Sequence, residues 1–193
     1  MKFKILLFLC FFLLMAAVPL LLAYGAVRPA ANTEEGAAAT ETVTNDTEAV
    51  CNAAASLCKK DYCEETIKAV TTIAKNNYRL KPDEYKNADY NSDKEISEIV
   101  AECYNSCPEI YINNENKYIP CSPCSCGLTD TDESYPYIQA VASPWDCFCE
   151  DYSDSNTCVG VSLSGINYLC SNGMTAQEAL RVYLSGVRFA DAS

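Results

Sequence analysis

The chain has 193 residues, with 13 cysteines, no histidine, and 26 acidic against 14 basic side chains, which gives a net charge of −12. So acidic a protein repels the phosphates of nucleic acids and of anionic membranes, and neither is expected as a partner. The lack of histidine excludes Ser-His-Asp and Cys-His catalysis in their usual forms, together with histidine-ligated metal sites.

The first residues carry the features of a secretory signal. Lys2 and Lys4 precede an apolar run over residues 5–23, and small residues follow it around Gly25. A basic start, an apolar middle and a small-residue exit predict a signal peptide over residues 1–25 that is removed on secretion. An uncleaved anchor is the alternative, because the run is nearly long enough to span a bilayer. In both cases the rest of the chain lies outside the cell, and no membrane insertion of the mature form is expected.

Residues 26–50 differ in composition from the cysteine-rich residues after them. They hold no cysteine and no aromatic residue, and they are rich in Ala, Thr and Glu. Such a segment has too little apolar surface to bury, so a disordered acidic linker or a pro-segment is predicted. Asn45-Asp46-Thr47 is a glycosylation sequon, and we therefore expect a glycoprotein modified at Asn45.

A cysteine-rich domain is predicted over residues 51–188. Cys10 lies in the signal, which leaves an even set of cysteines in the mature chain. In a short secreted chain an even set predicts a disulfide framework, whose pairing the sequence does not fix, rather than a zinc or redox site. The cysteines predicted to be disulfide-bonded are Cys51, Cys58, Cys63, Cys103, Cys107, Cys121, Cys124, Cys126, Cys147, Cys149, Cys158 and Cys170.

Helical patterns come first in this domain and also end it. Residues 51–77 carry apolar positions at helical spacing, and Pro82 interrupts the pattern. Ser92-Asp-Lys-Glu95 and Thr175-Ala-Gln-Glu178 are capping boxes, which predict the starts of two further helices.

Short β elements are predicted between and after these helices. Residues 109–112 and 117–119 flank a turn and predict a small hairpin, and alternation over residues 159–163 predicts one short strand. Residues 189–193 are expected to form a flexible tail. The predicted fold class is therefore mainly α with a small β-hairpin, in a small secreted domain stapled by disulfides.

The segment that begins at Asp89 resembles the first nine positions of an EF-hand calcium loop. Asp89, Asn91 and Asp93 would supply the first ligand oxygens. Lys94 stands where a glycine normally allows a sharp turn, and Val100 stands where a glutamate normally gives two oxygens. These departures leave a weak calcium candidate, and no metal or other cofactor is predicted.

The segment over residues 128–154 is a candidate binding surface. It holds seven carboxylates, no basic residue and the single tryptophan of the chain. A tryptophan among charged residues is a common anchor at protein interfaces, and packing against disulfides is an equally good account of it. The residues of the predicted surface are Asp130, Asp132, Glu133, Trp145, Asp146, Glu150 and Asp151.

The cysteine spacing partly resembles that of known secreted proteins. The pattern Cys51-x6-Cys58-x4-Cys63 is similar to the start of ciliate mating pheromones, which are small disulfide-bonded helical bundles. The spacing Cys103-x3-Cys107 is also found in insect odorant-binding proteins. The remaining cysteines fit neither pattern, so no family is assigned.

These observations predict a non-enzymatic protein that is secreted and acts by binding another extracellular protein, as an effector, toxin or pheromone-like signal. Its acidity favours a partner with a basic surface. One alternative is an extracellular carrier of a small apolar ligand, held between stapled helices. A second alternative is a hydrolase that uses a pair of carboxylates, since these need no histidine.

Overall fold

The computed structural model describes residues 37–86 and 93–190, with side chains from residue 46 onward. Residues 41–193 form one compact unit, separate from residues 1–40. The predicted signal peptide, Asp89 and Asn91 of the calcium candidate, and the last three residues lie outside the described part of the chain. Helices make up about half of the molecule, as predicted.

The first described helix, α2, begins earlier than the sequence analysis predicted. It covers Ala37–Leu57, so residues 37–50 are helical rather than part of a disordered linker. Alanine has the highest helix propensity of any residue, which favours a helix in this Ala-rich stretch. Val50, Ala53 and Ala54 are buried, so packing stabilises the last turns of α2. Asn45 lies within α2.

The helix predicted over residues 51–77 is two helices. The backbone at Cys63 is extended, and its N–H donates to Asn167 Oδ1 at 3.1 Å. This contact with a distant residue ends the helical path before α3 begins. The following helices and 3₁₀ turns are α3 (Glu64–Leu80), α4 (Pro82–Lys86), α5 (Lys94–Cys103), η1 (Tyr104–Ser106), η2 (Pro144–Phe148), α6 (Leu163–Ser171) and α7 (Ala176–Tyr183).

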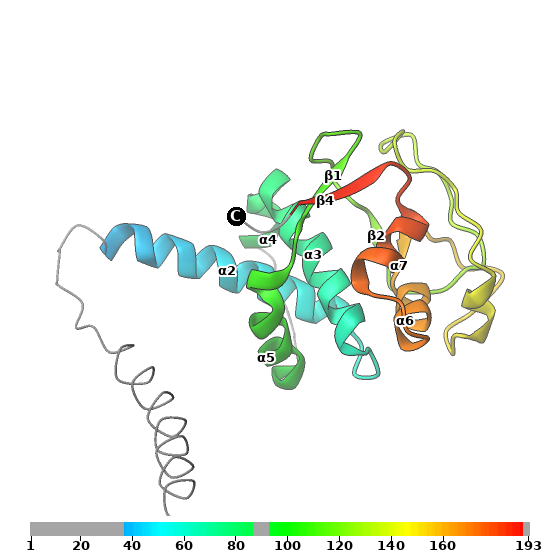
Figure 1. Cartoon of the computed structure of the whole chain (residues 1–193), viewed down its shortest axis with the longest axis horizontal. Coiled ribbons are helices and arrows are strands. Elements are labelled where there is room, and N and C mark those ends of the chain that lie inside the picture. The colour runs from blue at the N-terminus through cyan, green and yellow to red at the C-terminus, as the bar shows by residue number, and fades with distance from the viewer. Residues whose placement is uncertain (1–36, 87–92, 191–193) are drawn as a thin grey trace, which may run out of the picture. The chain divides into compact units, whose positions relative to one another are not determined.

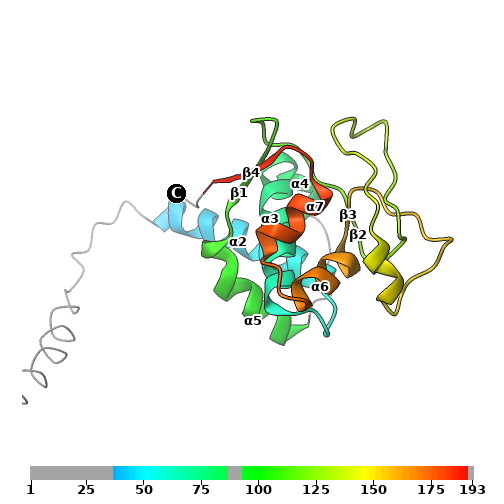
Figure 2. The same cartoon turned by 45° about the vertical axis from the view of Figure 1, so that its right-hand side comes forward.

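Helix α3 lies at the centre of the hydrophobic core. Ile67, Val70 and Ile73 recur at helical spacing and are at most 2% exposed. The helix contacts α5, α6, α7 and the strand β1 (Glu109–Ile112), and Figures 1 and 2 show it enclosed by them. The capping box predicted at Thr175 is confirmed at the start of α7. These local and packing signals agree, which makes this the part of the fold that the sequence specifies best.

A small antiparallel sheet is present, but its second strand is not the predicted one. Strand β1 pairs with β4 (Val187–Ala190), near the C-terminus. The predicted partner, residues 117–119, is instead held by Asn77, whose side chain accepts from Ile119 N and donates to Ile119 O, both at 2.8 Å. The sheet is therefore not a local hairpin, and the predicted flexible tail is a strand as far as Ala190.

Residues 121–160, called the loop region below, lie beside the helices and contain little regular structure (Figure 2). Strand β2 (Cys121–Ser122) begins this region, and it pairs in parallel with β3 (Val161–Ser162), which follows it. The strand predicted near residues 159–163 is therefore present but short. Helix α6 follows β3 directly. It was not predicted, because Gly165 and several small polar residues dilute its apolar pattern.

Candidate functional site

The twelve cysteines of the predicted framework all lie in the described part of the chain, as free thiols. The disulfide stapling therefore stays a prediction. Three groups of thiols interact: Cys63 with Cys170, Cys103 with Cys107, and Cys158 with both Cys124 and Cys126. The sulfur atoms of Cys124 and Cys158 lie 3.3 Å apart.

Trp145 and Asp146 of the predicted binding surface point into the protein. Asp146 is fully buried and accepts from the N–H of Cys126 at 3.0 Å. Trp145 Nε1 donates to the hydroxyl of Tyr183 at 2.9 Å, and that hydroxyl donates to Asp146 at 3.4 Å. Burial and the nearby Asp146 raise the pKa of Tyr183 above its usual range. The single tryptophan thus joins the loop region to α7 rather than presenting an open anchor.

The other acidic residues of the predicted surface are spread over the loop region. Asp130 and Glu133 are exposed, and Asp132 is half-buried and accepts from Ser134 N at 2.7 Å. Glu150 is exposed, and its neighbour Asp151 is half-buried. The structure therefore does not bring all seven predicted residues onto one surface.

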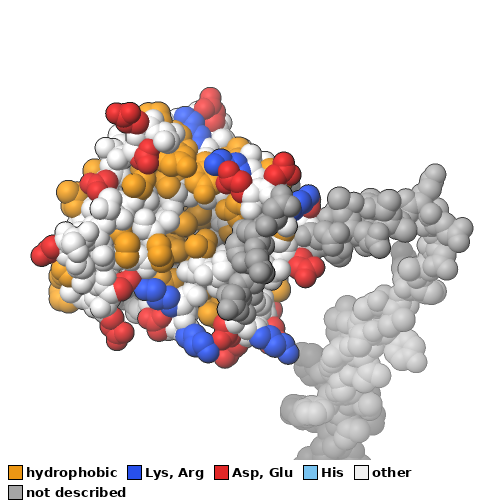
Figure 3. Space-filling view, turned by 180° about the vertical axis from the view of Figure 1, so that it is seen from behind, with side chains coloured by type: hydrophobic (Ala, Val, Ile, Leu, Met, Phe, Trp, Pro, Cys, Tyr) orange, Lys and Arg blue, Asp and Glu red, His pale blue; other side chains and the backbone are white. Residues whose placement is uncertain are grey.

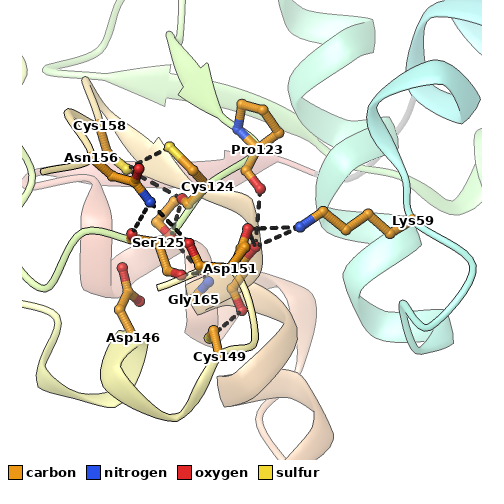
Figure 4. A network of polar contacts seen from close by, with 12 residues as sticks. Lys59, Pro123, Cys124, Ser125, Asp146, Cys149, Asp151, Asn156, Cys158 and Gly165 are labelled. Atoms are coloured by element: carbon orange, nitrogen blue, oxygen red, sulfur yellow. Dashed lines mark hydrogen bonds and ion pairs between the residues drawn. The ribbon is translucent and has the colours of Figure 1, made fainter. Parts of the chain in front are cut away.

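Asp151 is the centre of a polar network that connects the loop region to the helices (Figure 4). Its carboxylate accepts from Lys59 Nζ at 2.7 Å, Ser125 Oγ at 2.7 Å and Ser164 Oγ at 2.8 Å. Burial by itself would raise the pKa of Asp151, but the hydrogen bonds from these three side chains outweigh it and hold the pKa below its usual range. Asn156 ties the same loop together by donating to the backbone oxygens of Ser125 and Asp151.

This network has the composition of a Ser–Lys catalytic pair, but its hydrogen bonds do not suit that chemistry. Lys59 Nζ lies 3.3 Å from Ser164 Oγ, within reach of a general base and its nucleophile. An ammonium group that donates to a carboxylate has no lone pair with which to take the serine proton. Ser164 Oγ also lies 3.0 Å from the carbonyl oxygen of Pro123. These contacts favour a role in holding the loop region in place.

An open groove lies next to this network. It has a volume of about 570 Å³ and is formed by residues 59–62, residues 148–151 and helix α6. Phe148 is 71% exposed, and its ring stacks on that of Tyr168 with the centroids 5.5 Å apart and the planes 17° apart. The unstacked part of the ring is therefore an exposed apolar surface in the lining of the groove.

The charges along the groove are mainly acidic. Asp61 and Glu150 are exposed residues of its lining, and Asp151, the centre of the network, is a half-buried residue of the same lining. Among the residues that the structure describes, Lys59 is the one cationic residue of the lining, and the ion pair with Asp151 neutralises it. The groove therefore combines an exposed aromatic pair with uncompensated negative charge.

Figure 3 shows the face of the molecule behind that of Figure 1, with acidic and basic side chains around its edge and an apolar area near its centre.

The chain has another stacked aromatic pair. The rings of Tyr118 and Tyr135 stack with their centroids 5.5 Å apart, and Lys81 Nζ lies 4.7 Å from the centroid of the Tyr118 ring. These tyrosines already have partners within the chain, unlike the outer face of Phe148.

The described part of the calcium candidate is used for helix capping. Asp93 accepts from Glu95 N at 3.0 Å as the N-cap of α5, and it forms an ion pair with Lys60 at 2.8 Å. Within residues 37–86 and 93–190, no cluster of three or more acidic, cysteine or histidine side chains is arranged to hold a metal ion.

Sequence reasoning missed Phe148, Tyr168 and Lys59. Phe148 lies between two cysteines in a 3₁₀ turn that buries Asp146. In a 3₁₀ helix each residue turns by about 120°, so burying Asp146 directs Phe148 elsewhere. Tyr168 lies on α6, which was not predicted, so the stacking of Phe148 on Tyr168 could not be predicted from the sequence either.

No protein-family model and no curated protein sequence matches this chain. Across the part of the chain that the structure describes, no helix is both long and apolar enough to span a membrane.

Proposed function

We propose that this protein is secreted and acts by binding another extracellular protein through the groove beside Phe148. Its partner inserts an extended segment that carries an arginine or lysine side chain. The observation that carries the proposal is the 71% exposure of Phe148 while its ring is stacked on Tyr168. Stacking fixes one face of the ring at little entropic cost and leaves the other face for a ligand.

The charge of the groove supports a cationic occupant. A cation over the face of an aromatic ring gains about 0.5–2 kcal/mol, depending on how far it is desolvated. The exposed carboxylates of Asp61 and Glu150 lie in the same lining, where they attract a positive charge and repel a negative one. The net charge of −12 extends this attraction over the whole chain and speeds association with basic partners.

The groove suits a peptide segment better than a small apolar ligand. Binding sites for small apolar molecules enclose most of the ligand surface within largely apolar walls. Here the walls include Lys59, Asp61, Glu150 and Asp151, and the space is open to solvent. An extended segment can lie along such a groove with its backbone still in water.

Selection of displayed peptides tests this proposal. The full chain is secreted from cultured cells, purified and used to select binders from a library of short random peptides. We expect arginine and lysine to be enriched at one position of the selected peptides. Phe148→Ala should weaken their binding about tenfold, which corresponds to about 1.4 kcal/mol.

The matched control is Leu128→Ala. Leu128 is 55% exposed in the same loop region but does not line the groove, so its removal should leave binding unchanged. The proposal is wrong if the library yields no binders, if the binders lack cationic residues, or if Phe148→Ala binds them as well as the unchanged chain.

A further inference from the structure

One pair of cysteines is placed for covalent bonding across the loop region. The sulfur atoms of Cys124 and Cys158 lie 3.3 Å apart, and Figure 4 shows the two side chains facing each other. The Cys158 thiol also lies 3.2 Å from the carbonyl oxygen of Cys124. A disulfide bond is about 2.0 Å long, so small side-chain rotations would bring these sulfurs into bonding range.

We propose that Cys124 and Cys158 form a disulfide that closes the loop region at its base. In its formation the two thiols release two protons and two electrons. A disulfide donor, such as oxidised glutathione or a disulfide-carrying oxidoreductase, takes up the two electrons and the two protons and becomes two thiols. The new S–S bond is then the only covalent change in the chain.

Cys126 is the competing partner. Its thiol interacts with Cys158 as well, but it also donates to the carbonyl oxygen of Leu128 at 3.1 Å. Cys158 is fully buried, and burial together with the neighbouring thiols raises its pKa above the usual range. Because burial keeps Cys158 from the disulfide donor, we expect the half-buried Cys124 to form a mixed disulfide with that donor first. The thiolate of Cys158 then attacks the Cys124 sulfur, and the donor's thiol leaves.

The closed loop holds one wall of the groove. It contains Phe148 and Asp151, and contacts that attach it to the helices include the hydrogen bonds from Lys59 and Ser164 to Asp151. A covalent link between Cys124 and Cys158 fixes the position of this wall relative to β2 and to the start of α6. This consequence rests on the proposed function of the groove, whereas the bond itself does not.

Peptide mapping without reduction tests the bond directly. The secreted full chain is alkylated, digested with a mixture of glutamyl endopeptidase and chymotrypsin, and analysed by mass spectrometry with electron-transfer fragmentation to separate Cys124 from Cys126. We expect the peptide of Cys158 to be linked through Cys124. A link from Cys158 to Cys126 or to any other cysteine, or an alkylated Cys158, overturns the proposal.

A double variant separates the bond from the function. Cys124→Ser/Cys158→Ser removes the link without leaving either cysteine unpaired, and far-ultraviolet circular dichroism checks that the helices persist. We expect chymotrypsin to cut the loop region at least tenfold faster than in the unchanged chain, and peptide binding to fall with it. Unchanged cutting contradicts the role of the bond. If the unchanged chain has the mapped Cys124–Cys158 bond but binds no peptide, only the proposed function is contradicted.

Discussion

The helices and the loop region achieve burial in different ways. In α3, α6 and α7 the buried positions are mostly apolar, with Ile73, Ile166 and Leu180 among those that are at most 1% exposed. In the loop region most of the buried side chains are polar, namely Ser125, Thr129, Ser143 and Asp146, with Ile138 and Cys158 beside them. The first kind of burial is stabilised by transfer from water. The second depends on hydrogen bonds such as those that Asp146 accepts from Cys126 N and Thr129 Oγ1 accepts from Val141 N.

This difference explains where an open groove can form. The loop region is held in place by polar contacts, so it does not need to bury every aromatic side chain, and Phe148 can remain exposed. Two of these contacts are the hydrogen bond from Cys126 N to Asp146 and the ion pair of Lys59 with Asp151. The helices give rigidity, and the loop region displays the side chains of the groove.

The largest loss of stability is expected from a substitution that leaves a cavity in the core between the helices. Leu180 is fully buried on α7, and replacing it with alanine removes apolar contacts from the shared core. We expect Leu180→Ala to lower the free energy of unfolding by about 2–5 kcal/mol, measured by urea denaturation and circular dichroism. Val182→Ala on the half-buried side of the same helix is the control and should cost less. Equal losses would contradict a core centred on these helices.

The next largest effect is expected where the two regions meet. A Cβ atom at Gly165 would collide with the hydroxyl of Tyr183 and the carboxylate of Asp146. We expect Gly165→Ala to destabilise the fold by about 1–3 kcal/mol through this overpacking. The fluorescence of Trp145 should shift to longer wavelength, because the indole loses its contact with Tyr183. Ser171→Ala at the exposed end of α6 should leave the emission unchanged, and an unchanged spectrum in Gly165→Ala would contradict the contact.

The same contrast explains what could be predicted from the sequence. Helix α7 was predicted because its capping residues, Thr175 and Glu178, are three positions apart and act locally. The strand pair was only half predicted, because β4 lies far from β1 in sequence and Asn77 binds the expected partner at Ile119 from 42 positions away. Local rules carry no information about such contacts.

The candidate site was harder to predict for the same reason. Its acidic segment was found by composition, but composition does not distinguish the buried Asp146 from the exposed Glu150. The stacking of Phe148 on Tyr168 depends on a helix whose pattern is diluted by Gly165 and its polar neighbours. Only the folded chain brings Lys59 and Asp151 together, 92 positions apart.

The smallest effect is expected from the ion pair between Lys59 and Asp151, which links the two regions electrostatically. The side chains are 41% and 29% exposed, so solvent screens the pair, and Asp151→Asn should cost less than about 1 kcal/mol near pH 6. The pKa of Asp151 is lower in the folded chain than its ordinary value of 3.8. The folded state therefore binds this proton less readily than the unfolded state.

The sign of the pH dependence follows from this difference. The stabilisation is fully present above pH 3.8 and is lost as the pH falls through the lower folded-state pKa. We therefore expect the stability difference between the unchanged chain and Asp151→Asn to shrink as the pH falls from about 6 towards 3, measured by urea denaturation at each pH. Glu150→Gln changes an exposed neighbour and should show no such trend. If the difference instead grew at low pH, the carboxylate of Asp151 would not be stabilised by Lys59, and the two regions would be held together by packing and neutral hydrogen bonds alone.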